Sequence, residues 1–423
     1  MKMIGILATV LVTGLVLTTP AEGQVELHGF VEVASGIRFD DPGSTPVAWG
    51  EVPPGFRPKA WSGETDYTLR ESRVQLKGDL YGDVGEAHFV ADLLADQVAS
   101  DGAEVVLREG YVKFNAFSDH LEVRAGRQPT TWGTGDLLFI NDLFPKDYIS
   151  YFSGREDQYL KSPSDVVRLG VFGLPMEVDL VVTPQFTPDL VPTGERLVFW
   201  SPAFVRAMSP SEEVGNGELA LRISRYFGSV NLALYGYRGF WKSPQGAQSS
   251  AAGDIVGFYH PELRSYGASA RGGLFGGVGW VEGAFYDSNE DMDGTNPLIP
   301  NSELRAMGGY ERQWWSDFTG GAQIYWESVQ DFVDEHYIKD ENRILLTLRC
   351  TQMMRYQTLK LSGFGYWSPS DEDGYLRLLV GYDYSDQLNL TLGTNIFGGS
   401  DDRTQFAMHQ DNSNVYARVR FNF

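Results

Sequence analysis

The chain has 423 residues, a formal net charge of −22 and one cysteine, Cys350. The acidic balance argues against nucleic acid as a partner, and a lone cysteine excludes both a disulfide framework and a cysteine-based zinc site. A mean hydropathy of −0.24 is too polar for a bundle of membrane helices, so the length is that of a few ordinary domains or of one large β structure.

Residues 1–23 have the composition of a targeting segment. Lys2 precedes an apolar run at 3–17, and the small residues Ala21 and Gly23 precede a cleavage site before Gln24. This order predicts a secretory signal peptide that is removed; the alternative is a buried helix or an uncleaved anchor. Beyond residue 23 the sequence has no apolar run of about 18 residues, the length that a membrane helix needs.

Segments of about ten residues with alternating polarity follow from Gln24 onward. The first places Leu27 and Val31 on one face and Glu26 and Glu32 on the other. A tilted strand of this length crosses a bilayer. The segments that repeat the pattern are 25–39, 67–80, 84–95, 105–115, 121–128, 166–172, 176–185, 218–227, 230–240, 264–273, 277–286, 304–314, 318–328, 343–352, 358–367, 375–384, 388–397 and 415–423.

The last segment, 415–423, alternates without interruption. Its apolar face consists of Val415, Ala417, Val419, Phe421 and Phe423, and its polar face of Tyr416, Arg418, Arg420 and Asn422. The pattern predicts a β-strand with one apolar and one hydrated side. It ends on an aromatic residue, as expected where a strand reaches a water boundary.

The connections between these segments alternate in length. Short links such as 81–83, 173–175 and 385–386 take turns with long ones such as 40–66, 129–164 and 187–216. A soluble β-sandwich has no reason to sort its loops in this way. We therefore predict an all-β protein: a membrane-spanning, antiparallel up-and-down barrel of about 18 strands (at least about 16), formed by residues 24–423 as one domain, with short periplasmic turns and long extracellular loops.

Charged residues of both signs share the polar face of the predicted strands. Burying them in a dry core would be prohibitive, whereas a water-filled lumen accepts them, and a barrel of this size is too wide to be filled by its own side chains. Each of the longer connections carries a net negative charge. The mouth is therefore expected to attract cations, unless these charges only keep the loops solvated.

One stretch carries a family resemblance. It includes Arg108 and Glu109, continues as Gly126-Arg-Gln-Pro-Thr-Thr-Trp-Gly133 and ends with Pro145-Lys-Asp147. Over about 104–150 and at the terminal strand the chain resembles the porin-like outer-membrane barrels of Gram-negative bacteria, in particular a large group with a Gly-Arg-Gln…Trp-Gly…Pro-x-Asp signature. Gly110 stands where that group has Ala.

The resemblance implies an outer-membrane channel in which one long connection folds inward as a constriction. Residues 129–164 fit this expectation because they are too rich in aromatic side chains for a solvated loop; an external lid packed on its own aromatics is the alternative. The candidates for lining the pore or anchoring this segment are Arg73, Glu109, Arg124, Arg127, Gln128, Trp132, Asp136, Asp142 and Asp147.

A second, weaker motif suggests a calcium site. Asp287, Asn289, Asp291 and Asp293 alternate before Gly294, as in the first half of a calcium-binding loop. The glutamate expected at the twelfth position is replaced by Pro300. The motif is therefore more typical of an acidic turn, and we expect no other cofactor.

Catalysis has little support in the sequence. The six histidines are scattered, and only His28 and His88, with Ser72 or Asp92 on neighbouring strands, suggest a catalytic set. The leading hypothesis is therefore a non-enzymatic porin for passive diffusion of small hydrophilic solutes or ions. A barrel that sheathes a partner, such as a multihaem cytochrome, is the alternative.

The resemblance also implies a set of partners. These are outer-membrane lipids, lipopolysaccharide, the barrel assembly machinery through Phe423, and further copies of the chain.

Overall fold

The computed structural model describes residues 24–39, 59–60, 66–99, 102–117, 120–201, 207–333 and 340–423. The predicted signal peptide, 1–23, lies outside the described residues. Within the described part of the chain, no helix has both the length and the hydrophobicity needed to cross a membrane.

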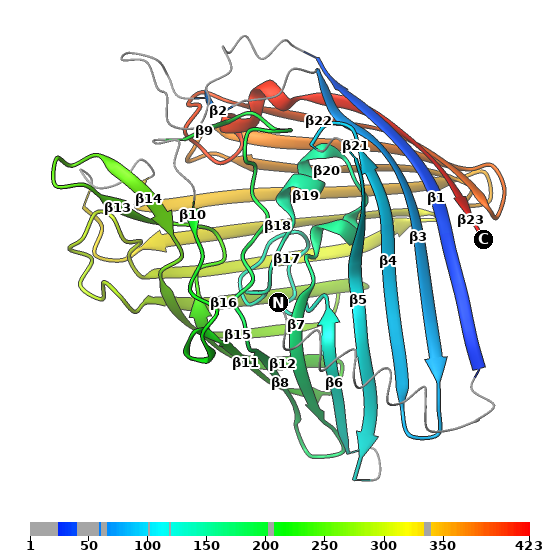
Figure 1. Ribbon diagram of the computed structural model, residues 1–423, viewed down its shortest axis with the longest axis horizontal. Coiled ribbons are helices and arrows are strands. Elements are labelled where there is room, and N and C mark those ends of the chain that lie inside the picture. Colours follow the sequence, from blue (N-terminus) through cyan, green and yellow to red (C-terminus); the bar gives the residue numbers. More distant parts are fainter. Residues whose placement is uncertain are drawn as a thin grey trace.

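Eighteen strands form one antiparallel sheet, and the ring that they make is visible in Figure 1. They are β1 (Gln24–Arg38), β3 (Tyr67–Tyr81), β4 (Glu86–Asp96), β5 (Ala103–Ala116), β6 (Leu121–Gln128), β7 (Ser164–Val171), β8 (Glu177–Thr183), β11 (Glu218–Phe227), β12 (Val230–Phe240), β15 (Glu262–Leu274), β16 (Gly277–Ser288), β17 (Glu303–Trp315), β18 (Phe318–Val329), β19 (Asn342–Met354), β20 (Leu359–Ser368), β21 (Asp373–Asp383), β22 (Leu388–Gly399) and β23 (Asn414–Asn422). The predicted barrel of about 18 strands is confirmed, and the predicted bounds agree to within a few residues.

The sheet closes on itself through its first and last strands. β1 pairs with β3 along one edge and with β23 along the other. The pairing extends to the C-terminal residue, because Phe423 and Gly29 exchange backbone hydrogen bonds of 2.9 and 3.0 Å. Gly29 is required there, since a Cβ atom at this position would lie 2.6 Å from the Phe423 ring. Among the described strands of the barrel, closure leaves no edge strand with unpaired backbone N–H and C=O groups, which is a requirement for a sheet in lipid.

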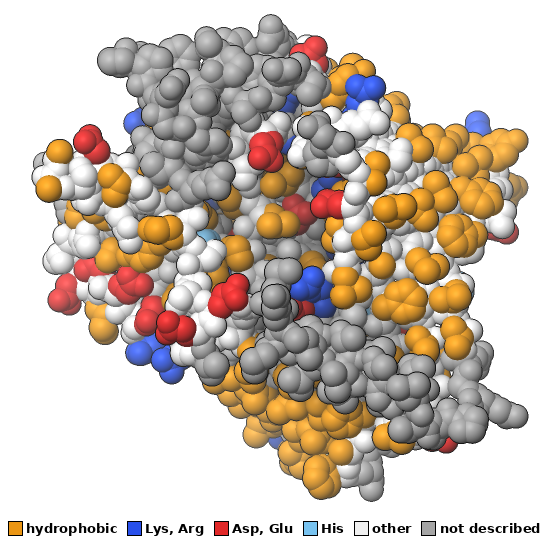
Figure 2. All heavy atoms as spheres, in the orientation of Figure 1, with side chains coloured by type: hydrophobic (Ala, Val, Ile, Leu, Met, Phe, Trp, Pro, Cys, Tyr) orange, Lys and Arg blue, Asp and Glu red, His pale blue; other side chains and the backbone are white. Residues whose placement is uncertain are grey.

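Apolar side chains cover the outside of the barrel. Leu27, Leu234 and Leu392 leave 57, 62 and 54% of their surface exposed, and Figure 2 shows the apolar side chains gathered over the outer faces of the strands. Successive side chains of a strand point to opposite faces, so neighbours such as Glu32 and Arg418 are buried on the inside. An apolar exterior around a charged interior is the arrangement of a membrane-spanning barrel.

The two ends of the barrel differ. One end, the short-turn end, has tight connections such as 228–229, 275–276 and 316–317, and both β1 and β23 have their terminal ends there. The other, the long-connection end, carries a three-stranded sheet of β10 (Ala207–Met208), β14 (Ile255–Tyr259) and β13 (Gly246–Ser249), and the pair β2 (Lys59–Ala60) and β9 (Phe199–Trp200). The 3-10 helices η2 (Val214–Asn216) and η4 (Ala407–Asn412) also lie in its connections.

Candidate constriction site

Residues 129–163, which are nearly the whole of the predicted connection 129–164, join β6 to β7 and lie inside the ring of strands, where their coiled ribbons are visible in Figure 1. They include α2 (Tyr148–Ser153) and η1 (Asp157–Leu160). We call this stretch the crossing segment, because its side chains and backbone contact inward-facing residues of strands all round the lumen. Its buried aromatic residues Phe144, Tyr151 and Phe152 belong to the main apolar cluster of the protein.

The first anchor of the crossing segment is Glu282 on β16, which is 4% exposed. One carboxylate oxygen accepts hydrogen bonds from the backbone N–H and the hydroxyl of Thr134, at 2.5 and 2.7 Å. The other accepts from the backbone N–H and the side-chain amide of Asn141, at 2.8 and 2.9 Å. One buried carboxylate thus holds both ends of a bend, and charge-assisted bonds of this kind are strong.

The tip of this bend is held by three more strands. The amide of Gln323 on β18 donates to the carbonyl of Asp136 and accepts from its backbone N–H, both at 2.8 Å. The Asp136 carboxylate lies 2.5 Å from Arg349 on β19. The hydroxyl of Tyr366 on β20 donates to the carbonyl of Leu137 at 2.8 Å. Leu137 has a φ of 56°, in the left-handed region that costs a branched side chain about 1 kcal/mol or more, so these contacts hold a strained residue in place.

Burial raises the pKa of Asp136, and the positive charge of Arg349 only partly offsets this effect. The Asp136 carboxylate therefore takes up a proton at a higher pH than a free aspartate does. Protonation would remove the charge that attracts Arg349, so this anchor weakens in acid.

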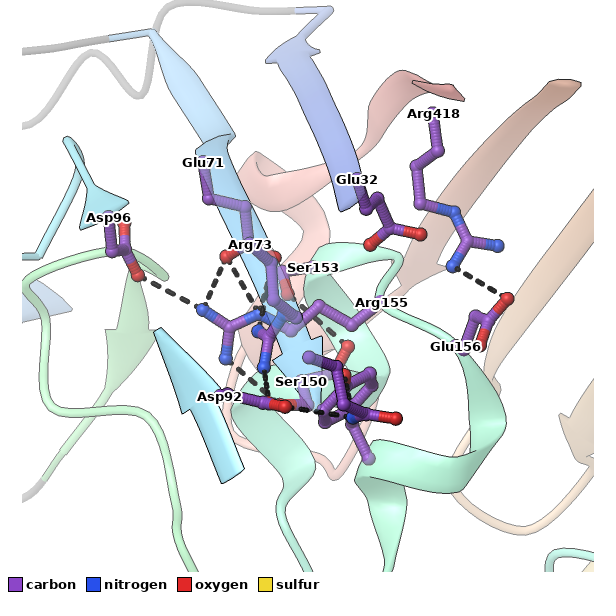
Figure 3. A network of polar contacts seen from close by, with 12 residues as sticks. Glu32, Glu71, Arg73, Asp92, Asp96, Ser150, Ser153, Arg155, Glu156 and Arg418 are labelled. Atoms are coloured by element: carbon purple, nitrogen blue, oxygen red, sulfur yellow. Dashed lines mark hydrogen bonds and ion pairs between the residues drawn. The ribbon is translucent and has the colours of Figure 1, made fainter. Parts of the chain in front are cut away.

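A second set of anchors lies at the far end of the crossing segment, after α2. Arg155 donates to Glu71 on β3 at 2.7 Å and to Asp96 on β4 at 3.0 Å, as Figure 3 shows. Glu156 accepts from Arg420 on β23 at 2.8 Å, and Asp157 accepts from Arg377 on β21 at 2.5 Å. The segment is therefore fixed to strands on widely separated parts of the wall.

The crossing segment also has internal support. The buried Asp142 carboxylate accepts from Lys146 at 3.0 Å, from Lys161 at 2.5 Å and from the hydroxyl of Thr131 at 2.7 Å. Burial alone would raise the pKa of Asp142, but the two lysines outweigh burial and lower the pKa below its ordinary value. Asp147 caps α2 by accepting from the backbone N–H of Ser150 at 2.8 Å.

A cavity lies on each side of the crossing segment. The outer cavity, of about 760 Å³, opens toward the long connections and is lined largely by apolar and aromatic residues, including Leu143, Trp241 and Leu298. The inner cavity, of about 610 Å³, opens toward the short-turn end and is lined mainly by polar and charged wall residues. Leu137 lines both cavities. The tip of the bend is therefore where the two spaces come closest.

The structure places most of the predicted site residues as supports of the crossing segment rather than as a lining. Of the nine, only Asp142 lines either cavity. Buried Arg73 is ion-paired with Glu71 and Asp92 and lies 4.2 Å from the ring centroid of Tyr159. Asp136, Asp142 and Asp147 have the roles described above.

The remaining predicted residues lie further from this centre. Gln128 is buried where the segment begins, and Trp132 donates to Asp179 at 3.2 Å. Glu109 lies 3.5 Å from His88, and Arg124 lies 3.3 Å from Glu122, both on the inner wall.

The prediction that Arg127 lines the lumen is wrong. On β6 it shares a face with Val123 and Ala125, whose cross-strand partners on β7 are apolar, and its own partner is Asp165. Arg127 and Asp165 form a bidentate ion pair of 2.9 and 3.0 Å on this outward face. Because the register is continuous along this strand pair, both side chains point away from the lumen.

Several residues that build the site were not singled out from the sequence. Glu282 is the one acidic residue within the apolar stretch 278–286, and that isolation is a signal which could have indicated an anchor. Gln323 and Tyr366 carry no comparable signal, because a glutamine or a tyrosine facing a wet lumen is ordinary. Leu137 could not be found from sequence, since its importance depends on a left-handed backbone.

The acidic motif at 287–294 forms a turn. Asp291 accepts from the backbone N–H groups of Thr295 and Asn296, at 3.2 and 2.8 Å, and the Asn289 amide donates to Glu262 at 2.6 Å. Among the described residues no group of three or more His, Cys, Asp or Glu side chains is arranged to hold a metal ion. The arrangement therefore gives the calcium prediction no support.

The suggested catalytic set does not assemble around Ser72. Ser72 pairs with Val33 in the register and lies on the exposed, outward face of β3, whereas His88 contacts Glu109 on the inner wall. The His88 ring lies between two carboxylates, 2.6 Å from Asp79 and 3.5 Å from Glu109. A histidine held in this way stabilises the inner wall.

No protein-family model and no curated protein sequence matches the chain. Among solved structures it is similar to a loop-deletion mutant of OmpT, an outer membrane protein of Vibrio cholerae, at 11% identity and a TM-score of 0.42, covering 95% of this chain and 99% of that one. It is also similar to a mutant of the Rh. blastica porin, at 11% identity and a TM-score of 0.44, covering 95% of this chain and 100% of that one.

Proposed function

We propose that the chain is an outer-membrane channel through which small hydrophilic solutes or ions diffuse passively. The observation that carries the proposal is the pair of cavities on the two sides of the crossing segment, one open toward each end of the barrel and both lined by Leu137. Passage then depends on the width beside Leu137 and on the charges that surround it.

The placement in the outer membrane rests on the closed sheet and its apolar exterior, which suit a bilayer. In this placement the long connections face the outside of the cell, the short turns face the periplasm, and residues 1–23 are the export signal. Lipids and lipopolysaccharide contact the exterior, and Phe423 serves barrel assembly. Association of several copies through the apolar exterior is part of the same proposal.

The structure leads us to expect two electrical properties of the channel, a low conductance and a preference for cations. The crossing segment is held by short hydrogen bonds that keep a fixed shape, so the conducting state is expected to be small and steady rather than wide. The acidic long connections concentrate cations at the outer mouth. A modest cation preference should therefore accompany a low conductance.

Planar-bilayer recording of the refolded barrel tests this function directly. We expect discrete, ion-conducting steps, with a reversal potential that favours cations under a salt gradient. Sealed bilayers that contain folded protein would refute the channel and leave the fold untouched. The positive control is a deletion of residues 131–141, the bend held by Glu282, which should enlarge the steps.

The alternative, a sheath around a secreted multihaem cytochrome, stays a prediction without a supporting observation. The crossing segment is tied to wall strands such as β3, β16 and β21. A protein threaded through the lumen would have to displace it and break these buried bonds. Co-purification of a haem protein in stoichiometric amount would favour the sheath.

A further inference from the structure

The inner cavity contains one buried cation whose hydrogen-bonding groups are largely unused. The side chain of Arg418 on β23 is 5% exposed and lines this cavity. Its Nε and Nη1 atoms have no hydrogen-bond partner. The nearest carboxylate oxygen, on Glu156, lies 3.8 Å from Nη1, which is too long for a hydrogen bond, and Figure 3 shows the two side chains facing each other.

The other arginines around the inner cavity are engaged. Arg349 pairs with Asp136 at 2.5 Å, and Arg377 pairs with Asp157 at 2.5 Å. Arg420 donates to Glu32 at 2.6 Å and to Glu156 at 2.8 Å. Because Arg420 already holds Glu156, Arg418 is left as a buried guanidinium that lacks a matched acceptor. A buried guanidinium whose only ion pair is a long one, and whose Nε and Nη1 donate no hydrogen bond, is poorly compensated, so such a group favours binding of an anion.

The wall beside Arg418 provides space and polar groups. Arg418 lies opposite Thr391, Thr391 opposite Gly381, and Gly381 opposite Lys360, in one row across β23, β22, β21 and β20. Small side chains therefore separate two cations along the row. Lys360 is exposed and lines the same cavity, as do Ser362 and Asn389, which offer hydroxyl and amide groups.

The carboxylates of this cavity limit the charge of a ligand. Glu32, Glu156, Asp157 and Asp383 also line it, so a multiply charged anion would be repelled. We propose that the inner cavity is a binding subsite for a small hydroxylated monocarboxylate. Arg418 binds the carboxylate of this ligand, and the polar groups of Lys360, Ser362 and Asn389 bind its hydroxyl groups. This inference rests on the proposed channel function and assigns a solute class to it.

The test uses gluconate as the probe, in bilayer recordings of the full barrel in potassium chloride. Gluconate bound at Arg418 should interrupt the current in a concentration-dependent manner, whereas glucose, its neutral counterpart, should not. Arg418→Gln should raise the gluconate concentration for half-block by about tenfold or more, because a charge-assisted pair is lost. Arg222→Gln is the matched control, since Arg222 also faces the lumen but contacts Asn231 on another part of the wall.

A second variant, Lys360→Gln, tests the subsite independently of Arg418. If Arg418→Gln does not fold, Lys360→Gln, at an exposed position, should still raise the half-block concentration severalfold. Conducting channels that gluconate does not block, or that it blocks equally in the Arg418 variant, would overturn the subsite while leaving the channel intact. An absence of any conductance would instead refute the proposed function.

Discussion

Replacing Glu282 by alanine should release the bend of the crossing segment from the wall. The substitution removes the acceptor of two backbone N–H groups, those of Thr134 and Asn141, and of two side-chain donors. Each buried N–H left without a partner costs about 1–3 kcal/mol, so the bend should lose about 2–6 kcal/mol of local stability. Because Arg155 and Asp157 keep their own partners, the barrel should stay folded.

Hydrogen exchange followed by mass spectrometry measures this loss. A decrease of about 2–6 kcal/mol in the opening free energy corresponds to a fall in amide protection of at least about thirtyfold for residues 131–142. Glu282→Gln keeps one acceptor oxygen and should cause a smaller fall. Single-channel steps should grow larger or noisier in both variants.

The control is Glu122→Ala, which removes a lumen-facing carboxylate that pairs with Arg124 on the same strand. It should leave the protection of residues 131–142 unchanged. If Glu282→Ala also left these amides protected, the claim that Glu282 anchors the bend would be refuted.

Three further predictions concern the crossing segment and its surroundings. Two lysines outweigh the effect of burial and hold the pKa of Asp142 below its value in the unfolded chain. The stability that the Asp142 carboxylate contributes is therefore present above about pH 4 and is lost as the pH falls further. Pepsin cleavage within 129–164 should increase over that range, and Asp142→Asn should flatten this pH dependence. Burial lowers the pKa of His409 to about 4, so the unfolded state binds the proton more tightly than the folded state does. The free energy of unfolding should therefore fall as the pH drops from about 6.5 to 4. Urea unfolding at several pH values measures this free energy, and His409→Asn should abolish its change with pH. Leu137→Trp should reduce the single-channel conductance, whereas Leu378→Trp on the outer face should not; equal conductance in both would contradict a path beside Leu137.

The barrel could be predicted from the sequence because the face to which a strand side chain points depends only on its neighbours along the chain. Successive side chains of a strand point to opposite faces, so the alternation at Val415, Tyr416 and Ala417 already states which side chains meet lipid and which meet the lumen. The same rule places Arg127 outside, on the face of Val123 and Ala125. The wrong prediction for Arg127 came from weighting a motif above the alternation.

The site could be predicted only in outline. The aromatic content of residues 129–164 indicated that this connection is not a solvated loop, and Asp136, Asp142 and Asp147 were among the residues singled out within it. Their partners were not accessible, because Glu282 lies 148 residues from Thr134 and Gln323 lies 187 residues from Asp136. No local pattern links such positions.

The sequence by itself therefore determined the strands, their inner and outer faces and the inequality of the two ends, since each follows from neighbouring residues and from connection length. Only the tertiary structure decided where the crossing segment attaches, that Leu137 lies between two cavities, and that Arg418 is left without a matched acceptor. These features arise when a curved wall brings distant strands around one segment, and which charges then find partners depends on three-dimensional distances that no periodicity encodes.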